Sequence, residues 1–114
     1  MLEALWTVEF ESTLGMGGTG IIVFEAGRVF GGDAGYIYRG KYDVTMGGNL
    51  IANIRINQID HPSGFTEPNV SGMDNYSLHV EGMIEEKQFT ASGYVVEDPS
   101  RKLDLRLTWR ADLP

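Results

Sequence analysis

A strict alternation of apolar and polar residues near the C-terminus constrains the fold of this chain more than any other feature. From Leu103 to Arg110 every second residue is apolar, and the residues between them are charged or polar. A period of two places apolar side chains on one face of a β-strand and polar side chains on the other. The same pattern recurs at 6–11 and 76–81, and only Ile51 interrupts it in 49–58. The sequence therefore predicts an all-β protein.

Turn-forming residues divide the chain into eight strands. Short links rich in Gly, Asn, Asp and Pro stand at 26–27, 46–48 and 97–100, and the polar pair 86–87 marks a fourth. Because nearly every link is short and joins consecutive strands, we expect an antiparallel up-and-down barrel, with a sandwich as the alternative. Eight strands can enclose either a packed core or one small ligand. The predicted strands are 4–12, 19–25, 28–32, 36–43, 49–58, 76–85, 88–97 and 102–110.

One segment, 59–75, has no strand pattern. Its residues Pro62, Gly64, Pro68 and Gly72 interrupt regular structure. Loops of this length in compact domains are usually functional or locally ordered. We expect a long loop with room for a short helix, which either covers one end of the barrel or packs on itself as a surface Ω-loop.

Length and charge exclude several classes of protein. A chain of 114 residues fits one domain, 1–114. It contains no Cys, so it has no disulfide, thiolate metal site or Cys nucleophile. With Lys+Arg 9 against Asp+Glu 16, its net charge of −7 argues against direct binding of nucleic acid. It shows no signal peptide and no apolar run long enough to span a membrane, so we expect a cytoplasmic protein without membrane contact.

A glycine-rich motif and two histidines are the candidates for chemistry. Residues 15–20 match G-x-G-x-x-G, but the β run Ile21–Phe24 follows where a dinucleotide fold needs a helix. We interpret the motif as a hairpin link. His79 alternates with apolar neighbours and His61 lies in the long loop, without the three or four ligands of a zinc site. We therefore assign no catalytic, cofactor-binding or metal residue, and expect a protein that is not an enzyme.

Inward-facing aromatic residues are candidates to line the barrel. They suit a carrier of a small apolar ligand, and they would fill a solid core equally well. The candidate lining residues are Trp6, Phe10, Phe24, Tyr38 and Trp109.

The stretch 20–40 carries a family resemblance. A hairpin between Gly20 and Gly27 is followed by Gly31-Gly32-Asp33 and then by Tyr38-Arg39-Gly40. Together with the opening strand at 6–10, this pattern resembles the GrlR-like negative regulators of type III secretion. The clear match covers about 4–57. We interpret Gly31, Gly32, Asp33 and Gly40 as structural, with glycines at a sharp strand end and Asp33 capping the turn.

The resemblance implies a small lipocalin-like barrel of bacterial origin that forms homodimers and binds another protein. In the founding regulator that partner is a helix-turn-helix transcriptional activator, which is held away from DNA. An acidic run follows the Tyr-x-Gly strand there, whereas only Asp43 is acidic near 44–48 here. We expect a non-enzymatic regulator that sequesters a protein partner; the alternative is a lipocalin-like carrier of an apolar ligand.

Overall fold

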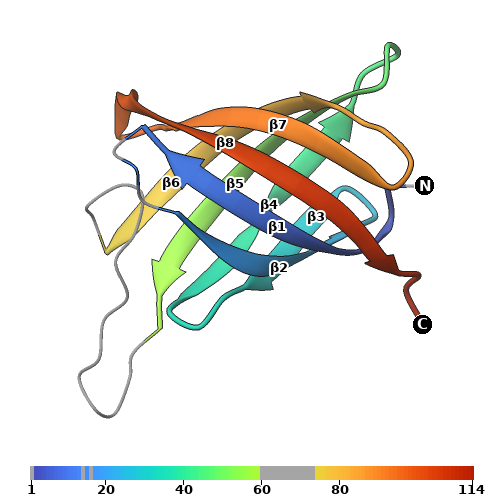
Figure 1. The fold of residues 1–114 in the computed structure, drawn as a ribbon, viewed down its shortest axis with the longest axis horizontal. Helices are drawn as coiled ribbons and strands as arrows, with labels where there is room; N and C mark the ends of the chain where they lie inside the picture. The colour runs from blue at the N-terminus through green and yellow to red at the C-terminus, as the bar shows by residue number, and fades with distance from the viewer. Residues whose placement is uncertain (1, 14, 16, 60–73) are drawn as a thin grey trace.

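The computed structural model describes residues 2–13, 15, 17–59 and 74–114 of the chain. Eight antiparallel strands follow one another in sequence order and close into a barrel, because the last strand pairs with the first (Figure 1). This confirms the predicted eight-stranded up-and-down barrel. The strands are β1 (Ala4–Ser12), β2 (Gly17–Glu25), β3 (Arg28–Gly32), β4 (Tyr36–Val44), β5 (Asn49–Gln58), β6 (Asn75–Met83), β7 (Gln88–Val95) and β8 (Asp98–Ala111).

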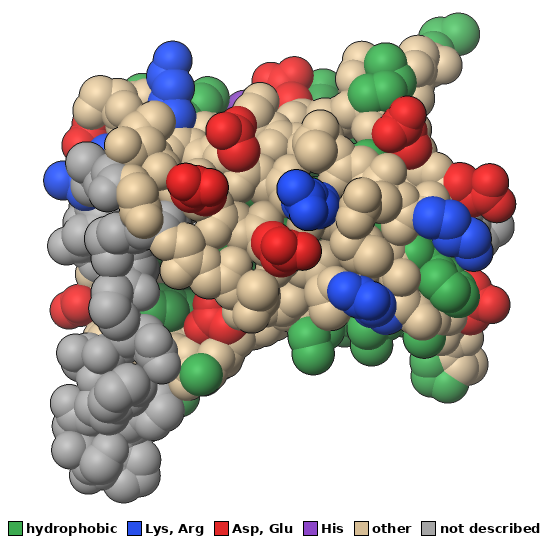
Figure 2. All heavy atoms as spheres, in the orientation of Figure 1, with side chains coloured by type: hydrophobic (Ala, Val, Ile, Leu, Met, Phe, Trp, Pro, Cys, Tyr) green, Lys and Arg blue, Asp and Glu red, His purple; other side chains and the backbone are tan. Residues whose placement is uncertain are grey.

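The alternating sequence pattern sorts side chains between the inside and the outside of the barrel. In β1, Ala4, Trp6 and Val8 are buried, while Glu9 on the outer face is exposed. The strand register places inward-facing residues of neighbouring strands opposite one another: Trp6 pairs with Ile22 of β2 and with Trp109 of β8. The outer face of β1, β7 and β8 bears acidic and basic side chains, which suit contact with water (Figure 2).

The two ends of the barrel differ. Links 26–27 and 84–87 and both termini lie at one end, on the right in Figure 1, which we call the tryptophan end. Here Trp6 is fully buried and meets Phe89 edge-on, with ring centroids 5.2 Å apart. Its indole N–H donates to the backbone carbonyl of Leu2 over 2.8 Å. The opposite, or tyrosine, end carries the link 33–35 and the turn 96–97.

Some predicted boundaries are wrong, and β8 shows why. It begins at Asp98, so the expected link 97–100 is replaced by a turn at 96–97. The register shifts between Tyr94, which faces Lys102, and Val95, which faces Asp98. This bulge accommodates Pro99, whose missing N–H a regular ladder would not tolerate. β6 ends earlier than predicted, at Met83.

Two interpretations of loops need comment. The glycine motif 15–20 is a hairpin link only in part: Gly15 has a φ of 79° in the link, whereas β2 already begins at Gly17. No helix follows, because the chain continues in β2. The short helix considered for 59–75 falls on 60–73, outside the described residues. In the part of the chain that the structure describes, no helix has the length and apolar character needed to cross a membrane.

Candidate ligand cavity

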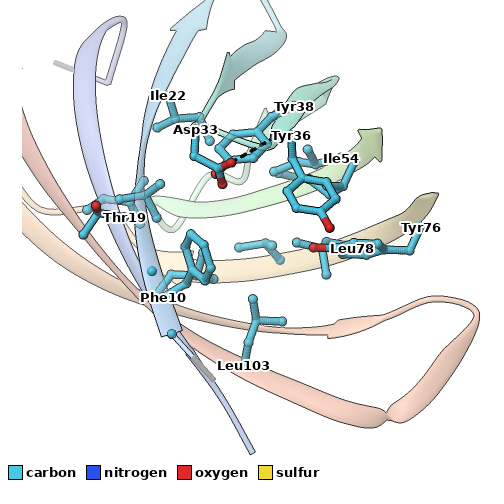
Figure 3. Close-up of a pocket in the computed structure, with 18 of the residues that line it drawn as sticks. Phe10, Thr19, Ile22, Asp33, Tyr36, Tyr38, Ile54, Tyr76, Leu78 and Leu103 are labelled. Carbon is cyan, nitrogen blue, oxygen red and sulfur yellow. Dashed lines mark hydrogen bonds between the residues drawn. The ribbon is translucent and has the colours of Figure 1, made fainter. Parts of the chain in front are cut away.

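A cavity of about 200 Å³ lies inside the barrel (Figure 3). Its wall is mainly apolar and comes from strands on nearly every side of the barrel. A smaller cavity of about 150 Å³, lined by Leu, Ile and Phe, is known to stay dry and bind benzene. The space here is therefore large enough for a substituted benzene ring. The apolar wall includes Val8, Phe10, Ile22, Phe24, Leu50, Ile54, Ile56, Leu78, Val80, Leu103 and Leu107.

Glycines on β2 open the space next to this wall. A Cβ at Gly18 would lie 2.9 Å from the ring of Phe10, and one at Gly20 would lie 2.5 Å from the hydroxyl of Tyr38. Real Cβ atoms do not approach other heavy atoms that closely. These two glycines therefore let the Phe10 and Tyr38 side chains occupy the barrel interior, which explains their place in the motif 15–20 without any phosphate chemistry.

Asp33 supplies the polar end of the cavity. Its Oδ1 accepts the backbone N–H groups of Gly35 over 2.9 Å and Tyr36 over 3.0 Å, which closes the turn between β3 and β4. Its Oδ2 accepts a hydrogen bond from the hydroxyl of Tyr38, drawn as a dashed line in Figure 3. The carboxylate is thereby held in one orientation at the tyrosine end of the cavity.

Three tyrosines line the cavity together with Asp33: Tyr36, Tyr38 and Tyr76. Burial raises the pKa of Tyr38 above its ordinary value, and the hydrogen bond to Asp33 raises it further. Burial also raises the pKa of Tyr76, with smaller contributions from Tyr36 and Asp33. The hydroxyls of Tyr38 and Tyr76 therefore stay protonated and neutral at physiological pH.

The aromatic residues predicted to line the barrel fall into two groups. Phe10, Phe24 and Tyr38 border the cavity. Trp6 belongs instead to the packed core of the tryptophan end, and Trp109 is half-buried there, with the ammonium of Lys87 4.1 Å from its ring centroid. The sequence interpretation missed Asp33 and Tyr76 as cavity residues. The signal for Tyr76 was present, since Tyr76 alternates with Leu78 and Val80, which face inward.

The motif glycines serve the sheet. Gly32 is the last residue of β3, at the predicted strand end, whereas Gly31 and Gly40 lie inside β3 and β4. A Cβ at Gly31 or Gly40 would stand well under 3.0 Å from a carbonyl oxygen of the neighbouring strand. These positions need glycine because adjacent backbones approach closely there, as at the corners of small barrels.

The candidate histidines lie apart from the cavity. His79 is on the outer face of β6, where its ring nitrogens lie 3.0 Å from Asn53 Oδ1 and 2.8 Å from Glu81 Oε2. Its ring stacks on Tyr94 with centroids 5.3 Å apart. Among the described residues, no group of three or more His, Cys, Asp or Glu could hold a metal ion. His61 is outside the described residues.

Comparison with solved structures supports the fold. The redesigned β-barrel mFAP1, solved bound to DFHBI, superposes with a TM-score of 0.68 and 17% identity over 94% of each chain. A second redesigned β-barrel, b11L5F_LGL, gives a TM-score of 0.51 and 15% identity over 96% of this chain and 91% of that one. No family model and no curated protein matches the sequence. At these identities the comparisons establish one thing: the chain is similar to closed β-barrels in its fold.

Proposed function

We propose that this protein binds one small apolar molecule inside its barrel, without catalysing a reaction. The observation that carries the proposal is the cavity of about 200 Å³, with an apolar wall and a carboxylate and hydroxyls at one end. Such a combination, an apolar body with a few placed polar groups, is typical of ligand sites. The similar barrel mFAP1, solved bound to DFHBI, lends support, because it shows that a barrel of this shape can hold a ligand.

The middle of the cavity suits an apolar guest better than water. A buried water needs two to four polar partners, and Ile54, Leu78 and Leu103 supply none. Side chains that border an empty space also lose the dispersion contacts that close packing would give them. An apolar guest restores these contacts and removes its own surface from water, which is worth about 25 cal/mol per Å².

Filling the cavity should therefore abolish binding. Leu78 borders the space from the middle of β6 (Figure 3), so a Leu78→Trp variant would place an indole where the guest belongs. We expect its affinity for ethylbenzene, measured by isothermal titration calorimetry, to fall at least about tenfold, a loss of about 1.4 kcal/mol. The matched control is Met83→Trp, since Met83 lies on the same strand and is 54% exposed; it should bind like the wild type. Equal binding by both variants would contradict the proposal.

A second candidate function is protein binding, favoured by an exposed apolar patch. The outer patch, as we call it, crosses β1 to β4 and consists of Leu5, Ile21, Val23, Phe30 and Ile37. Leu5 pairs with Val23, and Val23 pairs with Phe30. Gly32 lies between Ile21 and Ile37 in the register. Ile21 and Phe30 are 49% and 40% exposed. Neighbouring exposed apolar side chains of this kind mark interaction surfaces. We propose that a second copy of the chain covers the outer patch, forming the homodimer that the resemblance implies.

A charge in the outer patch should separate such a dimer. We expect sedimentation to show a dimer for the wild type and a monomer for Phe30→Asp, because burying an unpaired carboxylate costs several kcal/mol. Met83→Asp is the control, since Met83 is exposed on β6, away from the patch. A monomeric wild type would refute the dimer.

We also propose a regulatory role, in which this protein is cytoplasmic and holds a transcriptional activator away from DNA. Two observations support this role: the family resemblance of 20–40, and the acidic charge balance, which suits a basic partner.

A further inference from the structure

The charge inside the cavity has one sign. Among the described residues that line it, Asp33 carries the only formal charge, and none is Lys, Arg or His. The tyrosine hydroxyls next to it add no charge, because Tyr38 and Tyr76 keep their protons. A guest that enters the polar end therefore meets a negative charge, without a compensating cation among the described lining residues.

The hydrogen bonds that the described residues donate to the carboxylate of Asp33 leave room for one more donor. A carboxylate offers about four acceptor positions on its two oxygens. Asp33 uses two on Oδ1, for the N–H groups of Gly35 and Tyr36, and one on Oδ2, for the Tyr38 hydroxyl. Figure 3 shows the carboxylate directed into the cavity from the link between β3 and β4. The remaining position on Oδ2 can accept a hydrogen bond from a guest.

We infer that the cavity selects its ligand by head group: an apolar body of about one ring with a hydrogen-bond-donating amine or alcohol, and not a carboxylate. This inference rests on the proposed function and adds the chemical class of the ligand. An ammonium or hydroxyl donates to Oδ2 of Asp33 while the ring lies against Ile54, Leu78 and Leu103. An anionic head meets like charge at the same place, which is destabilising for both groups.

Four probes of one shape test the inference. Phenethylamine, 2-phenylethanol, phenylacetate and ethylbenzene share a phenyl ring and an ethyl or ethyl-like chain, and differ in the head group. In calorimetric titrations at pH 7, we expect phenethylamine to bind at least about tenfold more tightly than phenylacetate, the range expected for a hydrogen bond to a charged group. The alcohol should fall between them. Phenylacetate binding as tightly as phenethylamine would overturn the inference.

Two matched variants assign the selectivity to Asp33. Asp33→Asn removes the charge from the cavity, and the ratio of the two affinities should fall about tenfold. Asp104→Asn removes the same charge from the outer face of β8, where Asp104 is exposed, and should leave the ratio unchanged. If both variants keep the wild-type ratio, Asp33 does not select the head group and the inference is wrong.

The outcomes for the ligand class and for ligand binding itself are distinct. If ethylbenzene binds but the amine has no advantage over the carboxylate, the proposed function stands and the head-group selectivity falls. If none of the four probes binds to the folded wild type, both fall. If Asp33→Asn fails to fold, the inference is still tested by the order in which the wild type binds the four probes, together with the variant Tyr38→Phe. That variant keeps the carboxylate and its two backbone hydrogen bonds, so it must retain the preference for the amine.

Discussion

Replacing Gly31 with alanine should destabilise the barrel by about 3 kcal/mol or more, at the upper end of what overpacking costs. The new Cβ would overlap the carbonyl oxygen of Ile21 on β2 and lie 2.9 Å from the Cα of Ile22. Both obstacles are backbone atoms, so no side chain can rotate away. β2 and β3 would have to separate at this point, and hydrogen bonds of their ladder would be lost.

The effect can be read from urea unfolding followed by circular dichroism, with Gly47→Ala as the matched control. Gly47 lies in the turn between β4 and β5, and the only atom of a described residue that a Cβ there would meet is the Thr45 hydroxyl oxygen, 4.0 Å away. We expect that control to stay within about 0.5 kcal/mol of the wild type, as for an ordinary surface substitution. Similar losses in the two variants would show that close strand approach is not why Gly31 is needed.

Trp6→Ala should cost about 3–5 kcal/mol, the range for removing a large aromatic side chain from a core. Trp6 is fully buried, packs edge-on against Phe89, and lies at the centre of the tryptophan end. Its loss leaves a void and also leaves the Leu2 carbonyl without the indole N–H as its donor. Both effects act in the same direction, so this position should be among the most sensitive in the chain.

The neighbouring tryptophan provides the comparison. Trp109 lies directly opposite Trp6 in the register but is only half-buried, with Lys87 over its ring. We expect Trp109→Ala to cost about 1–3 kcal/mol, because less apolar surface returns to water than when a fully buried side chain is lost. Thermal and urea unfolding of both variants measure the difference. A larger loss for Trp109→Ala than for Trp6→Ala would contradict the packing described for the tryptophan end.

Much of the fold could be predicted because a barrel of consecutive hairpins depends on local signals. Alternation in 103–110 reports which side chains face inward, and Ala26-Gly27 supplies the positive φ values of a tight turn, 52° and 81°. The start of β8 was predicted wrongly because a bulge lets Pro99 stay within the strand. A bulge depends on how β7 and β8 pair, and local composition does not encode that pairing.

The cavity was less predictable than the fold. The alternation of side chains along the strands predicted that Phe10, Phe24 and Tyr38 line the barrel, but it predicted the same for Trp6 and Trp109. Which inward side chains fill the core and which border a space depends on how the two ends close in three dimensions. The bond between Asp33 and Tyr38 joins residues on either side of a turn, and the sequence pattern identified only the capping role of Asp33. Likewise, the resemblance singled out Gly31 and Gly40, but it did not predict that neighbouring strands approach closely there, which is why these positions need glycine.

A methyl NMR titration with ethylbenzene tests most directly whether the barrel holds a small apolar guest. The chain carries its own internal control, because Ile22, Ile54 and Ile56 line the cavity while Ile21 and Ile37 are exposed on the outer face. We predict saturable shifts of the three inner isoleucine methyls, with the outer two unchanged. If the folded protein shows no saturable shift at the inner methyls, or equal shifts at both sets, the barrel does not bind small apolar molecules in its cavity.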